Sequence, residues 1–127
     1  MIAVDTSALM AIILGEAEAD ACINILAAET EVLISAGTVA EAMIVAACRD
    51  VAKEMASLID GLGFNVVTVT AGSARRVARA HERWGKGMHP AGLNFGDCFA
   101  YAVAEEHSCG LLFIGDDFSK TDLQRVL

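Results

Sequence analysis

The sequence predicts an α/β protein in three layers (α/β/α), with a central, mainly parallel sheet of about four or five strands between two layers of helices. Three observations support this fold class. The chain has 127 residues without a repeat or linker, so we expect residues 1–127 to form a single domain. Apolar residues make up 55% of it, and alanine-rich stretches favour helices. The strand-like segments are short and continuously apolar, which is typical of parallel strands covered on both faces.

Strand and helix patterns follow one another along the chain. We expect strands at residues 2–4, 32–35, 65–69 and 111–114. We expect helices at residues 6–14, 18–29, 36–49, 51–62, 71–84 and 95–107, and a short final helix over 119–124. Gly15 and Gly63 end two of these helices, and Asp50 is placed to cap the helix that follows it. Residues 85–94 hold three glycines and the only proline, so we expect a loop there.

The composition narrows the class of protein. The apolar runs are too short to span a bilayer and no basic segment precedes the first one, so we expect a cytoplasmic protein without a membrane partner. The four cysteines are irregularly spaced without a C-x-x-C pair, which indicates reduced thiols rather than a zinc site or a disulfide framework. The net charge of −8 argues against tight, sequence-blind binding of nucleic acid.

The basic residues are concentrated in the expected helix over residues 71–84 and the start of the loop that follows it. Five of the nine Lys and Arg residues lie between residues 72 and 90: Arg75, Arg76, Arg79, Arg83 and Lys86. Arg75, Arg79 and Arg83 recur every fourth residue and so share one helix face. Such a face is either simply solvated or contacts the phosphates of an RNA backbone.

Acidic residues stand beside apolar sequence at four positions. Asp5 follows the first strand, Asp116 and Asp117 follow the last, and Glu41 and Asp97 lie on apolar helices. Singly, each is explained by a helix cap, a turn or a place near a helix N-terminus. In the predicted topology, however, all of them fall on the carboxyl edge of one sheet, where α/β proteins bind their ligands.

Unpaired carboxylates gathered in one cleft would repel one another, and a divalent cation relieves that repulsion. Oxygen ligands without His or Cys favour Mg²⁺ or Mn²⁺ over zinc. Such an ion activates a water and stabilises charge on a phosphoryl group. The residues themselves therefore predict a metal-dependent phosphodiesterase or phosphatase. Thr6 and Ser7 are then better candidates than Asp5 for the helix cap, which would leave the carboxylate of Asp5 free to face the metal.

Four motifs, in this order, resemble those of PIN-domain ribonucleases, and specifically the VapC toxins of bacterial toxin–antitoxin pairs. They are IAVDTSALMAIILGE, ISAGTVAEAMIVA, HPAGLNFGDCFAYAVA and LLFIGDDFSKTDL. The third is the most specific, and Asp97 matches its acidic position. In the fourth, the first acidic slot of the family tolerates Asn, so we assign the fourth acidic role to Asp117 and keep Asp116 as a weaker candidate.

The resemblance implies a Mg²⁺-dependent endoribonuclease that cuts RNA, such as tRNA, by metal-activated water without a covalent intermediate. It implies that Asp5 and Asp97 are the main metal ligands and that Glu41 and Asp117 complete the acidic cluster, directly or through water. Thr6 or Ser7 would orient a ligand. It also implies two partners: a second copy of the chain, which forms a homodimer, and a cognate antitoxin. The dimer and the antitoxin can assemble into a larger complex. The apolar surplus of residues 18–29 and 36–62 is suited to such an interface.

Two other classes compete with this hypothesis. A haloacid-dehalogenase-like phosphatase needs Asp-x-Asp after the first strand, where this chain has Asp-Thr-Ser, and a receiver domain needs an Asp after a middle strand, where VLIS and NVVTV offer none. A catalytically silent binding module would keep the fold and act only through its partner. The intact acidic positions favour an enzyme over such a module.

Overall fold

A computed structural model describes residues 1–127, and its centre is a parallel sheet of four strands in the order β3-β2-β1-β4. The strands are β1 (Ile2–Val4), β2 (Val32–Ser35), β3 (Asn65–Val67) and β4 (Gly110–Leu112). β1 lies in the middle and pairs with both β2 and β4. The expected parallel sheet is therefore confirmed, with all strands pointing the same way.

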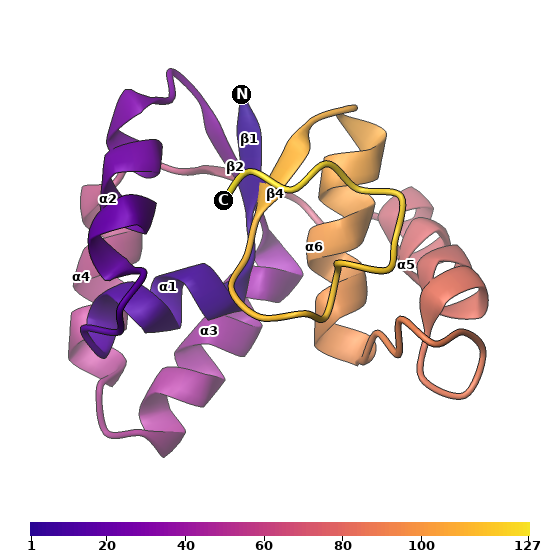
Figure 1. Ribbon diagram of the computed structural model, residues 1–127, viewed down its shortest axis with the longest axis horizontal. Coiled ribbons are helices and arrows are strands. Elements are labelled where there is room, and N and C mark those ends of the chain that lie inside the picture. Colours follow the sequence, from indigo (N-terminus) through magenta and orange to yellow (C-terminus); the bar gives the residue numbers. More distant parts are fainter.

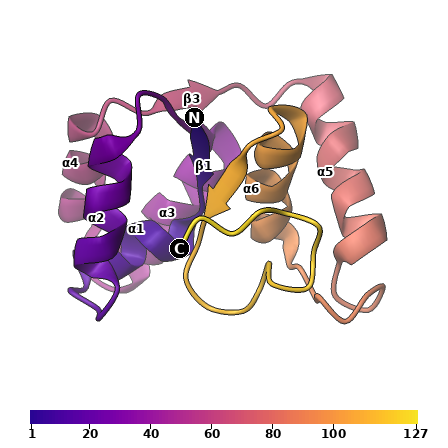
Figure 2. The same ribbon diagram turned by 45° about the horizontal axis from the view of Figure 1, so that its top comes forward.

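Six helices cover the two faces of this sheet. They are α1 (Thr6–Ile13), α2 (Ala19–Ala28), α3 (Ala36–Cys48), α4 (Ala52–Gly61), α5 (Ala71–Trp84) and α6 (Phe95–Glu106). Figure 1 shows α1 to α4 on one side of the strands and α5 with α6 on the other, and Figure 2 shows the same division from above. The three-layer fold is thus confirmed. No helix combines the length and the apolar character that crossing a bilayer would require.

Alternating side chains of the short strands supply both cores. Ile2, Val4 and Ile34 pack into a cluster with α1 to α4, whereas Ala3 and Leu33 pack into a second cluster with α5 and α6. Because both faces are covered, every residue of β1, β2 and β4 is buried. This burial explains why these strands are continuously apolar in the sequence.

The C-terminal segment differs from the prediction of a helix over 119–124. Those residues form turns, with Thr121 N–H donating to the Phe118 carbonyl at 3.1 Å. The chain then pairs with β4, since Leu111 N–H donates to the Gln124 carbonyl at 3.1 Å. Phe118 is buried against Phe113, with 5.1 Å between ring centroids. Because the ring of Phe118 is anchored and the backbone at Gln124 pairs with β4, this segment does not form a helix.

Some element boundaries also differ from the prediction. β3 ends at Val67, two residues earlier than expected, and β4 occupies Gly110–Leu112 rather than 111–114. Asp50 does not cap α4, because it adopts a left-handed conformation with a φ of 59° at the turn between α3 and α4. The N-cap of α4 is Val51, which makes no side-chain cap bond.

Candidate active site

Asp5 ends β1 and caps α1 with one of its two carboxylate oxygens. Its Oδ2 accepts hydrogen bonds from Ser7 N–H at 3.0 Å and from the Ser7 hydroxyl at 2.7 Å. The expectation that Thr6 or Ser7 forms the cap is therefore wrong: the carboxylate that directly precedes the helix accepts a hydrogen bond from the amide of the second helical residue, Ser7. The other oxygen of Asp5, Oδ1, is buried and has no hydrogen-bond partner.

Ser7 joins Asp5 to the end of β4. Its hydroxyl donates to Asp5 and accepts a hydrogen bond from Ile114 N–H at 3.0 Å. Asp5 N–H donates to the Leu112 carbonyl at 3.0 Å. The first acidic residue and the segment that leads to Asp116 and Asp117 are thus fixed to each other, although they lie more than a hundred residues apart in sequence.

Asp97 lies in the first turn of α6, on the buried side of the helix. Its Oδ2 accepts from Asn94 N–H at 3.0 Å, and its own N–H donates to Asn94 Oδ1 at 2.9 Å. This reciprocal capping box fixes the orientation of the Asp97 carboxylate. Asn94 was not among the predicted site residues, although the Asn-x-x-Asp spacing before an apolar helix was the available signal.

Glu41 reaches the site from α3. Thr6 donates its hydroxyl proton to Glu41 Oε1 at 2.6 Å, so the residue after Asp5 holds the second acid in place. The carboxylate of Glu41 lies against Gly96, at the N-terminus of α6, where a Cβ atom would overlap Oε2. Gly37 allows a similar approach one turn earlier on α3, since a Cβ atom there would overlap the ring of Phe99. These two glycines let α3 and α6 cross closely beside the acids, and neither was among the predicted site residues.

The electrostatic state of the site shows that the carboxylates influence one another. Burial raises the pKa of Asp97 to about 7, and the nearby charges of Asp5, Asp117 and Glu41 add to this rise. Burial also raises the pKa of Asp5 to about 6, although its hydrogen bonds from Ser7 oppose the rise and the charge of Glu41 reinforces it. These effects on the pKa values of Asp5 and Asp97 are consistent with the expectation that the acids lie in one region of the fold.

Asp116 and Asp117 are both exposed, but their settings differ. Asp117 is among the charges that raise the pKa of Asp97. Asp116 contributes its backbone carbonyl to the turn, where it accepts the Ser119 hydroxyl at 2.6 Å. Of the two, Asp117 is therefore the one whose charge is felt at the centre of the cluster.

The donor set fits a hard divalent cation only in part. The unpartnered, buried Oδ1 of Asp5 and the charge-repelled carboxylate of Asp97 are oxygen donors of the kind that Mg²⁺ or Mn²⁺ prefers. No three Asp, Glu, His or Cys side chains are gathered closely enough to form a metal site by themselves. Mg²⁺ commonly uses one or two carboxylates and keeps several waters, so Asp5 and Asp97 would suffice to hold it.

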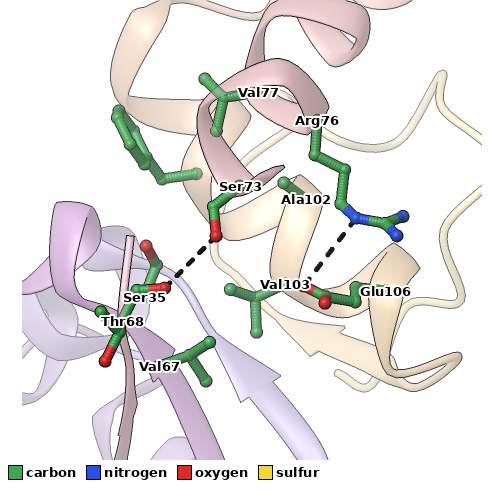
Figure 3. Close-up of a pocket in the computed structure, with 10 residues that line it drawn as sticks. Ser35, Val67, Thr68, Ser73, Arg76, Val77, Ala102, Val103 and Glu106 are labelled. Carbon is green, nitrogen blue, oxygen red and sulfur yellow. Dashed lines mark hydrogen bonds and ion pairs between the residues drawn. The ribbon is translucent and has the colours of Figure 1, made fainter. Parts of the chain in front are cut away.

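The basic helix α5 lies alongside α6, and its arginines fall into two groups. Arg76 pairs with Glu105 and Glu106 of α6 at 3.7 and 3.9 Å, and Figure 3 shows its side chain extended toward Glu106. Arg83 pairs with Asp122 at 3.4 Å and lies over the ring of Trp84. Arg75, Arg79 and Lys86 are exposed and form no ion pair, so they are the cations free to meet another molecule.

The hollow drawn in Figure 3 does not add a second substrate site. It lies between β3, α5 and α6, beside Ser35, Thr68 and Ser73, and its volume is about 10 Å³. That volume holds about one water molecule.

Comparison with known proteins places this geometry in a family. Residues 2–123 match the PIN domain. The ribonuclease VapC36 of Mycobacterium tuberculosis is 42% identical over 125 residues, which cover 95% of this chain and 90% of the relative. The ribonuclease VapC28 of the same organism is 41% identical over 128 residues, which cover 98% of this chain and 96% of the relative.

Solved structures agree on the fold. The crystal structure of VapC20 from M. tuberculosis, described as a toxin that cleaves the sarcin–ricin loop, superposes with a TM-score of 0.78 at 21% identity and covers 98% of this chain and 97% of that one. A toxin–antitoxin complex from Klebsiella pneumoniae gives a TM-score of 0.72 at 20% identity and covers 96% of this chain and 93% of that one. The match over nearly the whole chain and the identity to curated relatives show that this chain belongs to the PIN-domain family, among the VapC ribonucleases.

Proposed function

We propose that the chain is a metal-dependent endoribonuclease toxin that hydrolyses structured RNA, such as tRNA, at the cluster of Asp5, Glu41, Asp97 and Asp117. The observation that carries this proposal is the buried, unpartnered Oδ1 of Asp5 in a site where burial and neighbouring carboxylates raise the pKa values of Asp5 and Asp97. A buried anionic oxygen without a partner is costly, and a bound cation removes that cost. The relatives named as ribonucleases support the same conclusion.

In this proposal Asp5 and Asp97 hold Mg²⁺, with Mn²⁺ as a substitute, and Glu41 and Asp117 act directly or through water. When bound, the ion would supply an activated water and would stabilise charge on the phosphate. The chain's own residues orient the ligands. Ser7 fixes Asp5, Asn94 fixes Asp97, and Thr6 fixes Glu41, each by a hydrogen bond of 3.0 Å or less.

The proposal also includes partners. The solved structures similar in fold include toxin–antitoxin complexes, which supports a cognate antitoxin that inhibits this chain in the cytoplasm. RNA would contact the unpaired cations Arg75 and Arg79 of α5 and Lys86 just after that helix. Arg76 and Arg83 would contribute less because they form ion pairs within the chain. We further propose a homodimer, alone or within the antitoxin complex.

Cleavage of RNA by purified chain, freed of antitoxin, tests the proposed site. With Mg²⁺ we expect cleavage that EDTA stops, and a loss of at least roughly a hundredfold in kcat for Asp5→Asn and for Asp97→Asn, because each change removes an anionic ligand. Asp60→Asn, at an exposed position near the end of α4, is the matched control and should cleave normally. Cleavage unaltered in both site variants would eliminate this site.

The silent binding module remains the second candidate. It predicts that wild-type chain binds its antitoxin yet cleaves no RNA under any divalent ion. Growth arrest on expression separates the two as well, since the enzyme predicts arrest by the wild type and none by Asp97→Asn.

A further inference from the structure

Three of the four acids in the proposed cluster are held by a hydrogen bond to their own carboxylate. They are Asp5, Glu41 and Asp97, and in each case a neighbouring side chain or backbone amide donates the bond. Asp117 is the fourth acid. It is exposed, and no hydrogen bond or ion pair to another residue fixes its carboxylate. Its place in the site therefore depends on the segment of backbone that carries it.

The segment of residues 116–123 is closed into turns by its own hydrogen bonds. Ser119 donates through both its N–H and its hydroxyl to the carbonyl of Asp116, at 3.1 and 2.6 Å. Thr121 donates in the same way to the carbonyl of Phe118, at 3.1 and 2.7 Å. We therefore expect this segment to move as a unit, so that whatever anchors it also sets where its acid lies.

Tyr101 connects this segment to the helix that carries Asp97. Tyr101 lies one turn after Asp97 on α6, is 1% exposed, and donates its hydroxyl proton to Asp122 Oδ1 at 2.7 Å. The buried ring of Phe118 and the pairing of Gln124 with β4 attach the segment to the core and to the sheet. The hydrogen bond to Asp122 is the one that attaches it to α6. Figure 2 shows the segment, in yellow, turning toward α6 before it returns to the sheet.

The direction of this hydrogen bond is set by the groups around the hydroxyl. Trp84 Nε1–H can only donate, and it donates to the hydroxyl oxygen of Tyr101 at 2.9 Å. The proton of Tyr101 is thereby left for the carboxylate of Asp122. Burial and this hydrogen bond raise the pKa of Tyr101 to about 12, so the hydroxyl keeps its proton at neutral pH. Arg83 pairs with the second oxygen of Asp122, Oδ2, at 3.4 Å, so that both oxygens are engaged.

We propose that Tyr101 is a positioning residue for Asp117, because its hydroxyl holds the turns after β4 against α6 and so keeps Asp117 beside Asp97. Asp117 lies close enough to Asp97 for its charge to contribute to the raised pKa of that carboxyl. The inference rests on the proposed function for the role of Asp117. The attachment of the segment to α6 does not depend on it.

A double-mutant cycle on RNA cleavage tests this role, with Tyr101→Phe and Asp117→Asn made singly and together. At a temperature where all variants are folded, we expect Tyr101→Phe to lower kcat by roughly tenfold, because a small misplacement of a group at the site is costly. In the Asp117→Asn background the same change should lower kcat by less than about twofold, because the carboxylate that it positions is already gone. Equal losses in both backgrounds would indicate a merely structural role and would overturn the proposal, as would an unchanged kcat for Tyr101→Phe.

The acceptor side of the bond provides a second variant and a matched control. Asp122→Ala removes the acceptor and should repeat the result of Tyr101→Phe in the cycle. Glu105→Ala also removes a carboxylate near the Tyr101 hydroxyl, at 3.5 Å, but this carboxylate belongs to α6 itself. It should leave kcat within about twofold of the wild type. A loss for Glu105→Ala as large as that for Asp122→Ala would contradict the assigned cause.

Hydrogen exchange of the chain without metal or RNA separates this inference from the proposed nuclease. The amides of Ser119, Thr121 and Leu123 are hydrogen-bonded within the segment. Asp122→Ala should speed their exchange by at least roughly tenfold more than that of the amides of β1, which report the stability of the whole fold. A parallel change in both sets, or none, would overturn the proposal. If the wild type cleaves no RNA, the proposed function fails, and this measurement still decides whether Tyr101 and Asp122 hold the segment.

Discussion

Asp97 lies in a setting that disfavours its ionised form. It is buried, its backbone partner Asn94 satisfies one oxygen, and the charges of Asp5, Asp117 and Glu41 oppose its ionisation. With a pKa of about 7, it takes up a proton in the folded chain over a pH range in which the unfolded chain has already lost it. The stabilising effect of this proton is present below pH 3.8 and is lost as the pH rises to about 7.

This gives a pH-dependent prediction for Asp97→Asn. The variant removes the charge, so its melting temperature should exceed that of the wild type at pH 8 and the difference should shrink toward zero near pH 4. Each kcal/mol recovered corresponds to about 4 °C for a domain of this size. Scanning calorimetry from pH 4 to pH 8 measures the difference, with Asp60→Asn as an exposed control. A difference that does not change with pH would contradict the assigned cause.

At the scale of residues, the sequence predicted a set of acids for the site but not how each side chain is held. Asp5 and Asp117 follow apolar strands, and the topology of a parallel sheet was enough to bring them to one edge. One oxygen of Asp5 is hydrogen-bonded and the other is not because of the side-chain rotamer of Asp5 and the position of Ser7. Tertiary packing decides both. For this reason a cap by Thr6 or Ser7 was predicted and is wrong.

At the scale of elements, the close crossing of α3 and α6 sets where Glu41 stands. The helices meet at Gly37 and Gly96, each facing a side chain of the other helix with no room for a Cβ atom. Glycine in a helix costs about 0.5–1 kcal/mol relative to alanine, so these residues lower the stability of their helices but allow α3 and α6 to approach closely. This close approach brings the carboxylate of Glu41 against the first turn of the helix that carries Asp97.

Gly96→Ala should therefore displace Glu41 and lower kcat by roughly tenfold or more, while the melting temperature changes little because the better helix former offsets part of the strain. Gly61→Ala is the matched control, since Gly61 also lies in a helix and its added Cβ meets no neighbour. Cleavage kinetics and thermal melts of both variants make the comparison. Full activity of Gly96→Ala would show that the position of Glu41 is not critical.

The arginines of α5 allow a second test at this scale. Replacing Arg75 and Arg79 by alanine should weaken binding of a non-cleavable RNA, and should reduce the slope of log affinity against log salt by roughly one for each phosphate that the variant no longer binds. Arg76→Ala is the internal comparison and should change that slope less, because Arg76 is paired with Glu105 and Glu106. Equal slopes for all variants and the wild type would mean that this helix face is only solvated.

The elements themselves were largely predictable from the sequence because each long helix has a regular spacing of apolar residues and three of the four strands, β1, β2 and β4, are short buried runs. The expected helix over 119–124 failed for a reason that local sequence does not contain. Phe118 is held by Phe113, and the backbone of Gln124 pairs with β4, so long-range contacts override local propensity there.

At the scale of the whole molecule, a series of polar contacts that starts at the buried Trp84 and Tyr101 connects the C-terminal segment to the helical layer of α5 and α6. Trp84 Nε1–H donates to the Tyr101 hydroxyl at 2.9 Å, and Tyr101 donates to Asp122 at 2.7 Å. Asp122 in turn pairs with Arg83 of α5. Figure 1 shows this segment, in yellow, running from the end of β4 across α6 and back to the sheet.

Tyr101→Phe breaks this chain and leaves the indole N–H of Trp84 without an acceptor. We expect the free energy of unfolding to fall by about 1–3 kcal/mol and the segment after residue 115 to become more sensitive to proteolysis. Ser119→Ala removes a hydrogen bond within the segment itself, to the Asp116 carbonyl, and should change stability by less than about 0.5 kcal/mol. Denaturant titration with limited proteolysis measures both effects. A Tyr101→Phe chain as stable and as resistant as the wild type would contradict the proposed tie.

Asp5 caps α1 with one carboxylate oxygen and leaves the other without a partner. This has a practical consequence for anyone who needs a catalytically inactive variant of this protein. Asparagine at this position can still cap α1 through its amide oxygen, so we expect a folded protein that lacks the negative charge of Asp5. Alanine would remove the cap as well and would confuse loss of chemistry with loss of fold. Asparagine is therefore the substitution to choose when the intact chain is wanted as bait for the proposed antitoxin or for an uncut RNA.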